Sequence, residues 1–416
     1  MTMDALISEA RGRPGDDPIF TLNALANARQ ARGEPVINAS LGALLEDDGK
    51  LAVMPTVFEA FRSVPPERAA AYAPIAGDRP YLEAVVRDAL GEGALADNAV
   101  AVATPGGTGA LLNAMMNFLE PGQAVYTSSY YWSPYRIIAE HNRRKVETFT
   151  MFNESGAFDV DAFESGLVDL LERQGRALVL LNFPCHNPTG YSLNGAEWDA
   201  VAAALGRAAD LGPVILLVDL AYAQFGAQAP TAWVRALEPI ASKITVLAAW
   251  TASKSFAQYG ARVGALIASV VDPAGREQVA NAISFTCRGS WSNCNHMGLL
   301  AVSELLRDKE LAERVEAERA ELVDLLKERV EVFNREAQAM ELRYPRYEGG
   351  FFVSVFTPDA GETARVAAEA GVYVVPMDGA VRIALCAVAK RDIPRLVEEV
   401  ARGVRAATER SLEVEA

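Results

Sequence analysis

Four short stretches of almost purely apolar residues limit the folds open to this chain more than any other feature. They cover residues 177–181, 214–218, 244–247 and 263–267, and they do not alternate polar with apolar side chains. Strands that are buried on both faces have this composition, whereas strands with one solvated face alternate. Helical patterns lie between them, for example over residues 196–208. The alternation predicts an α/β fold with a parallel or mostly parallel sheet covered by helices.

The last hundred residues show a different pattern of expected helices and strands. A long, charged, amphipathic helical pattern covers residues 308–337, and a final helix is expected from Ile393 onward. Short strands are expected near residues 351–356 and 372–375. This order of elements predicts a separate, smaller α+β unit that is reached through a long helix.

A chain of 416 residues is long enough for two domains, at about 100–200 residues each. We predict a large domain over residues 51–320. Residues 321–416 form the smaller domain, together with an N-terminal arm of residues 1–50. The arm has few core-like runs, so we expect it to pack on the small domain or on a partner subunit.

Charge and composition exclude several classes of protein. The chain has 39 Lys and Arg against 54 Asp and Glu, a net charge of -15, whereas a nucleic-acid-binding surface needs a basic excess. No apolar stretch reaches about 18 residues, and the N-terminus lacks the pattern of a secretory signal, so no membrane partner is expected.

Sparse cysteines and histidines narrow the chemistry further. The four cysteines form no CxxC pair, which is typical of a reduced, cytoplasmic protein. The three histidines, His141, His186 and His296, are scattered along the sequence, which argues against a His-rich metal site or a Ser-His-Asp catalytic triad. No metal is therefore expected.

Two glycine-containing turns precede or follow predicted elements. Residues 105–110 (Pro-Gly-Gly-Thr-Gly-Ala) lead into a helix, where backbone N–H groups and the helix dipole favour an anion. The run lacks the Lys of a P-loop, so it indicates one phosphate, with a plain glycine turn as the alternative. Residues 187–190 (Asn-Pro-Thr-Gly) follow a strand and either form only a turn or direct the Asn187 amide into a ligand crevice.

Two charged residues also follow predicted strands. Asp219 ends the stretch 214–218, and Tyr222 comes three residues later. A carboxylate there is costly to desolvate unless it meets a cation or a donor, although it could also cap the next segment. Lys254 follows the next strand, with Arg262 beyond it. Lys254 is either an ordinary surface lysine or, held in a pocket, an amine able to form a Schiff base.

Together these positions supply what pyridoxal phosphate requires: an anion cradle, an amide, a carboxylate with a nearby tyrosine, and a lysine followed by an arginine. The chain resembles fold-type I, pyridoxal-phosphate-dependent aminotransferases of class I, in the aspartate/aromatic aminotransferase branch. The resemblance extends from about Gly42 to Arg382. Its most specific part is the set of motifs around Asn187, Asp219 and Lys254.

The resemblance implies a role for each matching residue. Lys254 is expected to hold pyridoxal 5'-phosphate as an internal aldimine and then to shuttle the substrate proton. Asp219 is expected to pair with the pyridine nitrogen, Tyr222 and Asn187 with the ring hydroxyl, and Trp132 to stack on the ring. The phosphate is expected to meet a mixed set of groups, namely Gly106, Gly107, Thr108, Thr251, Arg262 and, from the neighbouring subunit of a homodimer, Tyr72.

The resemblance also implies a substrate site. Arg382 is expected to bind the substrate α-carboxylate, with Gly42 and Asn187 beside it. Arg288 matches the arginine that reaches across the dimer to a second carboxylate, although Cys294-Asn295 stands where the family has two prolines.

Three further positions bear on the family pattern. Gly106 stands where the family often has serine, and Tyr135 stands where close relatives often carry histidine. His186 is expected either to support Asp219 from behind or to be a plain buried histidine.

We therefore expect an aminotransferase that moves an amino group between an L-amino acid (aspartate, glutamate or aromatic) and a 2-oxo acid by a ping-pong mechanism. The alternative is another pyridoxal-phosphate enzyme on the same fold, such as a β-lyase, a decarboxylase or a cyclising lyase. A non-catalytic transcription regulator with this fold is disfavoured, because the segment before Gly42 is short for a DNA-binding domain and the chain is acidic.

Overall fold

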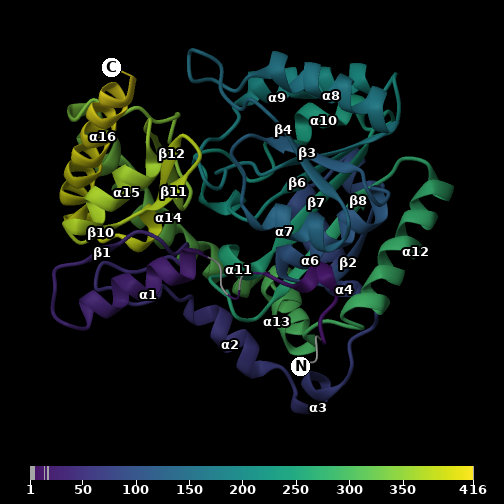
Figure 1. The fold of residues 1–416 in the computed structure, drawn as a ribbon. Coiled ribbons are helices and arrows are strands. Elements are labelled where there is room, and N and C mark those ends of the chain that lie inside the picture. Colours follow the sequence, from purple (N-terminus) through teal and green to yellow (C-terminus); the bar gives the residue numbers. More distant parts are fainter. Residues whose placement is uncertain (1–4, 14, 16–17, 416) are drawn as a thin grey trace.

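The structure is a computed structural model that describes residues 5–13, 15 and 18–415. It has two lobes, and the larger is built on a seven-stranded sheet in the order β2-β8-β7-β6-β5-β3-β4 (Figure 1). These strands are β2 (Ala99–Pro105), β3 (Ala124–Ser128), β4 (Lys145–Phe149), β5 (Ala177–Leu181), β6 (Val214–Asp219), β7 (Thr245–Thr251) and β8 (Val263–Ser269).

Helices cover both faces of this sheet. One face packs on α6 (Gly106–Phe118), α7 (Pro134–His141) and α12 (Pro273–Ser290). The other packs on α4 (Arg79–Leu90), α8 (Val160–Gln174), α9 (Gly195–Ala208), α10 (Val234–Leu237) and α13 (His296–Arg307). Successive strand residues point to opposite faces, so Leu216 enters one core and Leu217 the other. Both cores need apolar residues, which explains why the strands do not alternate.

The smaller lobe contains the antiparallel sheet β11-β12-β9, formed by β9 (Phe352–Phe356), β11 (Val375–Met377) and β12 (Ala380–Ala384). It also contains α15 (Ala360–Glu369), α16 (Ile393–Glu415) and the end of α14 (Lys309–Ala339), the long helix that leads from the larger lobe (Figure 1).

The N-terminal arm joins the small lobe. Its helix α1 (Pro18–Gln30) lies beside that lobe, and β1 (Ile37–Asn38) pairs in parallel with β10 (Val372–Tyr373) (Figure 1). The remaining elements are short: α2 (Pro55–Ser63), α3 (Pro66–Ala70), α5 (Ala94–Asp97), α11 (Ala252–Ser255) and the 3-10 turns Ser8–Ala10, Ala223–Phe225, Glu238–Ile240, Leu385–Ala387 and Lys390–Asp392.

The predicted fold class is confirmed. The sheet is mostly parallel, but β8 runs antiparallel to both β7 and β2. An apolar strand buried on both faces has the same composition in either direction, so its direction could not be predicted. The strand expected at 372–375 is divided between β10 and β11, which belong to different sheets. The domain boundary at residue 320 falls inside α14 and stays a prediction.

None of the helices in the described part of the chain combines the length and hydropathy needed to span a bilayer.

Candidate active site

The predicted site residues gather where the parallel strands of the large sheet end. Asp219 is the last residue of β6, and it is paired in register with Ala249 of the neighbouring strand β7. That strand ends at Thr251, and the short helix α11 that follows carries Lys254. Because parallel strands end at the same edge, their last residues face one crevice.

Lys254 lies beside two tyrosine rings. Its Nζ atom is 5.5 Å from the ring centroid of Tyr222 and 5.7 Å from that of Tyr259. Burial lowers the pKa of Lys254, the nearby Asp219 carboxylate opposes this, and the Arg262 guanidinium adds to the lowering. A lysine that gives up its proton readily can act as a nucleophile and as a base.

Asp219 is held by donors on each carboxylate oxygen. The hydroxyl of Tyr135 donates to Oδ2 at 2.6 Å, and the N–H of Ala221 donates to Oδ1 at 3.1 Å. Burial raises the pKa of Asp219, while the Tyr135 hydrogen bond and the charge of Lys254 lower it. Tyr135 is fully buried, so this donor cannot be replaced by water.

Asn182 ties Asp219 to Asn187. Its Nδ2 donates to the Asp219 carbonyl at 2.8 Å, and its Oδ1 accepts the N–H of Asn187 at 2.7 Å. Sequence reasoning did not single out Asn182, although a polar residue directly after the buried stretch 177–181 was a usable signal.

Asn187 and Tyr222 lie side by side in the crevice. Asn187 Nδ2 donates to the Tyr222 hydroxyl at 3.4 Å, and burial raises the pKa of Tyr222. The buried Oδ1 of Asn187 has no hydrogen-bond partner among the residues that the structure describes. A buried acceptor without a partner is costly, so it fits a donor supplied by a ligand.

The glycine-rich turn brings α6 against Arg262. Gly106 begins α6 with a φ of +69°, and a Cβ placed there would lie 2.2 Å from Arg262 Nη2. A side chain at this position would have to displace the guanidinium and adopt a strained backbone, so glycine is favoured where the family often has serine. Thr108 follows in the first turn of α6 and is exposed.

Hydroxyl groups complete this cradle. Arg262 Nη1 donates to Ser253 Oγ at 3.0 Å, and the Thr251 hydroxyl donates to the same oxygen at 2.9 Å. Thr251 also lies next to Gly107, whose added Cβ would be 3.6 Å from it. A guanidinium, hydroxyls and a helix N-terminus together suit a small dianion such as phosphate. Ser253 was not among the predicted phosphate contacts.

A cleft of about 1290 Å³ opens beside these residues. Its walls include Trp132, Asn187, Arg382, Ile19 of the N-terminal arm and Met377 of the small lobe, so both lobes contribute. Trp132 meets Tyr135 edge to face, with ring centroids 5.6 Å apart. Trp132 is thus linked through Tyr135 to Asp219.

Arg382 and Gly42 meet at one end of this region. Arg382 is buried in β12, its Nη2 donates to the Ser40 carbonyl at 2.7 Å, and its guanidinium lies 4.7 Å from the Phe352 ring centroid. An added Cβ on Gly42 would lie 2.3 Å from the same ring, so only glycine fits there.

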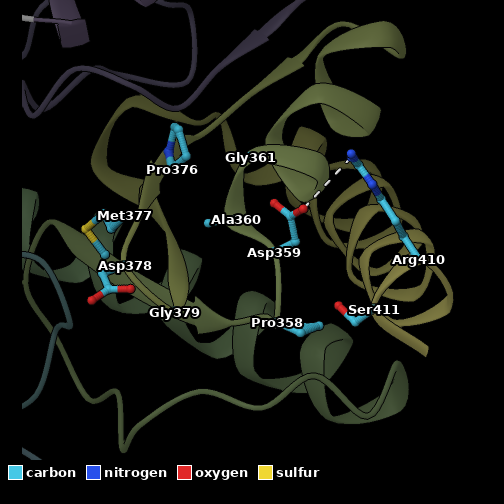
Figure 2. A pocket seen from close by; sticks show the side chains of 10 residues that line it. All are labelled: Pro358, Asp359, Ala360, Gly361, Pro376, Met377, Asp378, Gly379, Arg410 and Ser411. Carbon is cyan, nitrogen blue, oxygen red and sulfur yellow. Dashed lines mark ion pairs between the residues drawn. The ribbon is translucent and has the colours of Figure 1, made fainter. Parts of the chain in front are cut away.

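Residues 376–378 also line a second cavity, of about 640 Å³, in the small lobe (Figure 2). Figure 2 shows Arg410 of α16 reaching toward Asp359, an ion pair with a separation of 4.0 Å. None of the predicted site residues lines this cavity.

Tyr72 and Arg288 do not join the cleft of their own chain. Tyr72 is 90% exposed, and Arg288, in the last turn of α12, donates from Nη1 to Ser292 Oγ at 2.7 Å.

The expectation that His186 supports Asp219 is wrong. His186 pairs with Thr189 at 2.8 Å and with Ser128 at 3.3 Å, and burial lowers its pKa to about 3. It is a neutral, buried histidine, and Tyr135 holds Asp219 instead. The turn after β5 places Asn182, not His186, next to the end of β6.

Comparison with known proteins identifies the family of this chain. The family model described as aminotransferase class I and II matches residues 34–400. The chain belongs to this family.

Aminotransferase relatives cover nearly the whole chain. It is 30% identical to the tyrosine aminotransferase of Klebsiella pneumoniae over 88% of this chain and 93% of that protein. It is 29% identical to the aspartate aminotransferase of Pseudomonas aeruginosa over 92% of this chain and 96% of that protein. The crystal structure of an aminotransferase from Anaerococcus prevotii superposes with a TM-score of 0.90 and 32% identity, covering 97% and 100% of the two chains.

One structural neighbour contains a cofactor. The aromatic-amino-acid aminotransferase of Burkholderia pseudomallei, described as covalently bound to pyridoxal phosphate, has the same fold, with a TM-score of 0.81 and 24% identity over 96% of this chain and all of that one. Three observations show that the residues of this aminotransferase fit such a group. Lys254 is desolvated, and Asn187 Oδ1 is a buried acceptor without a partner in the described residues. The missing side chain of Gly106 leaves the space that the Arg262 guanidinium occupies.

Proposed function

We propose that this aminotransferase attaches pyridoxal 5'-phosphate to Lys254 and moves amino groups between an L-amino acid and a 2-oxo acid. The observation that carries the proposal is the desolvated Lys254 amine, whose pKa is influenced by both the Asp219 carboxylate and the Arg262 guanidinium of the cradle. The relatives reported above are named aminotransferases, which favours amino-group transfer over lyase or decarboxylase chemistry.

Three residues act on the reacting part of the cofactor and substrate. Pyridoxal phosphate, when bound, would supply an electron-withdrawing group to the substrate Cα. Lys254 would hold the cofactor through its Nζ atom and would take up and return the Cα proton, because burial lowers the pKa of its amine. Asp219 would accept a hydrogen bond from the protonated ring nitrogen, and the Tyr135 hydroxyl, which donates to Asp219 Oδ2, holds that carboxylate in place.

The remaining cofactor contacts orient the ring. Asn187 and Tyr222, which lie side by side, would hold the ring hydroxyl, and Trp132 would pack on the ring. The phosphate would be held by the cradle groups Gly106, Gly107, Thr108, Thr251, Ser253 and Arg262.

The substrate binds through its carboxylates. Arg382 binds the α-carboxylate, beside Gly42 and Asn187, and a fork-shaped guanidinium suits this task. Arg288 binds a second carboxylate in the partner's cleft. Aspartate, glutamate and aromatic amino acids are the proposed donors, in accord with the names of the relatives.

The active protein is proposed to be a homodimer with shared sites. Tyr72 and Arg288 are exposed and lie outside the cleft of their own chain, as expected for residues that complete the site of a partner subunit. The four cysteines are all free thiols, which supports action in the reducing cytoplasm.

An absorption spectrum of the purified protein tests the proposal. The lysine-bound cofactor should give a visible band that is absent from Lys254→Ala, and L-aspartate or L-phenylalanine should convert it to the band of pyridoxamine phosphate. A wild-type protein that takes up no pyridoxal phosphate would refute the proposal. A bound cofactor that no amino acid converts would refute amino-group transfer.

A further inference from the structure

We infer that His296 is a positioning residue that holds the Tyr72 segment in the shape needed by the partner's site. The inference rests on the proposed function, in which Tyr72 reaches the phosphate bound by the partner subunit. It concerns a histidine that lies outside the cleft and takes no part in the chemistry proposed above.

His296 contacts both ends of one segment, residues 71–78. Its Nδ1 lies 2.9 Å from the carbonyl oxygen of Ala71, and its Nε2 lies 3.0 Å from Asp78 Oδ2. The two side chains are mostly buried, with 11% of His296 and 21% of Asp78 exposed. Tyr72 follows directly after the first of these contacts.

Both ring nitrogens of His296 face acceptors. A carbonyl oxygen can only accept, so Nδ1 donates the hydrogen bond to Ala71. Nε2 lies 3.0 Å from the Asp78 carboxylate at the other end of the segment. His296 therefore contacts the segment at residues 71 and 78.

Asp78 is committed to His296. It is the residue that precedes helix α4, yet in the described part of the chain its side chain makes no capping hydrogen bond to that helix. Aspartate at this position usually accepts an N–H of the first turn. Here Oδ2 of the carboxylate lies 3.0 Å from the His296 ring instead.

The support behind His296 reaches the phosphate cradle of the same chain. His296 is the first residue of α13, and the preceding Asn295 donates from Nδ2 to the carbonyl of Ala261 at 2.9 Å. Gly298, two residues on, packs so closely that an added Cβ would lie 2.5 Å from Val263 Cγ2. Ala261 and Val263 flank Arg262, so the start of α13 packs against the phosphate cradle of its own subunit. The same part of α13 contacts residues 71–78, the segment that carries Tyr72 toward the partner's site.

Tyr72 needs such a support because it has little of its own. It is 90% exposed, whereas Ala73 is buried in the core of the large lobe. The far end of the segment is also fixed by the N–H of Ala103, which donates to the Ala76 carbonyl at 2.7 Å. At the near end, the N–H of Ala71 donates to the Arg68 carbonyl at 3.3 Å, and the Ala71 carbonyl is held by His296. Loss of His296 should therefore loosen the peptide that leads into Tyr72.

Mixed dimers separate an effect on the partner's site from an effect on the residue's own site. One subunit carries Lys254→Ala, so only the other subunit gives the visible band of the lysine-bound cofactor. His296→Ala is placed either on the Lys254→Ala subunit, which lends Tyr72 to the reporting site, or on the reporting subunit itself. Two affinity tags isolate each mixed dimer, and titration of the band with pyridoxal phosphate gives the cofactor dissociation constant.

We expect His296→Ala to raise this dissociation constant about three- to tenfold when it lies on the Lys254→Ala subunit, and to leave it nearly unchanged on the reporting subunit. The range is below the roughly tenfold or larger loss expected when Tyr72→Phe removes a hydrogen bond to a charged group. Asp78→Asn, which keeps the side-chain shape, should follow the same pattern. Equal effects in the two arrangements, or no effect in either, would overturn the inference.

Two further variants complete the design. Val302→Ala, at a fully buried position of the same helix α13, should destabilise the fold without preferring the partner's site. Tyr72→Phe tests the proposed function itself. If Tyr72→Phe on the Lys254→Ala subunit leaves the dissociation constant of the reporting site unchanged, the proposal of a shared site is wrong. If Tyr72→Phe raises that constant but His296→Ala does not, only the inference on His296 is overturned.

Discussion

The hydrogen bond from Tyr135 to Asp219 gives the sharpest quantitative test of the site, with Tyr135→Phe as the perturbation. Phenylalanine keeps the buried ring and its contact with Trp132 but removes the hydroxyl that donates to Asp219 Oδ2 at 2.6 Å. A buried carboxylate oxygen then lacks its donor. A hydrogen bond to a charged group contributes about 1.5–3 kcal/mol, and we expect the free energy of unfolding of the cofactor-free protein to fall by that amount at neutral pH.

The pH dependence of this loss has a definite sign. Burial raises the pKa of Asp219, and the Tyr135 hydrogen bond counteracts the rise. The folded state therefore binds the Asp219 proton more tightly than the unfolded state, and stability falls as pH rises above the ordinary carboxyl pKa. Removing the hydroxyl raises the pKa of Asp219 further, so the stability difference between wild type and Tyr135→Phe should widen from acidic to neutral pH.

Urea unfolding of the cofactor-free protein at fixed protein concentration, near pH 5 and near pH 8, measures both quantities. Tyr131→Phe is the matched control, because the Tyr131 ring stacks parallel to Tyr135 with centroids 6.3 Å apart. A loss below about 0.5 kcal/mol, the range of ordinary surface substitutions, would refute the reasoning. A stability difference that is larger at pH 5 than at pH 8 would also refute it.

Three other substitutions test the remaining parts of the site. Lys254→Ala should abolish turnover while circular dichroism shows an intact fold, and normal turnover would exclude Lys254 as the nucleophile and proton carrier. Arg288→Ala should lower kcat/KM for aspartate far more than for phenylalanine, because only aspartate leaves a second carboxylate without its partner; equal losses would remove Arg288 from substrate recognition. Gly106→Ala should destabilise the protein by about 1–3 kcal/mol and weaken binding of pyridoxal phosphate at least tenfold, because the added methyl displaces Arg262 and the backbone has a φ of +69°. Unchanged cofactor affinity in that variant would show that Arg262 does not hold the phosphate.

Local composition was enough to predict much of the fold. The stretches 177–181 and 214–218 are strands because a position buried on both faces admits only apolar residues, and this shows in the sequence. The long helix predicted at 308–337 is α14, Lys309–Ala339, since its amphipathic period is visible over many turns. The reversed direction of β8 left no local trace, because strand direction depends on the connections and neighbours that packing selects.

The candidate site also combines features that can be predicted from local sequence with features that depend on packing. Asn187, Asp219 and Lys254 were predicted because polar residues at the ends of buried strands are conspicuous in one dimension and because strands of a parallel sheet end together. The side chains that hydrogen-bond to these residues were not predicted in that role. Tyr135 lies 84 residues from the carboxylate it donates to, and Asn182 lies 37 residues from the carbonyl it binds.

The amino-acid sequence by itself determined which residues can be buried, which can bear the chemistry, and that they belong to an aminotransferase. Only the tertiary structure decided that Tyr135 rather than His186 supports Asp219, that Gly106 makes room for Arg262, and that His296 holds the segment of Tyr72. Burial and periodicity are properties of neighbouring residues along the chain and can be read locally. Hydrogen bonds between distant side chains depend on distances of a few ångströms, which exist only once the sheet and helices have packed.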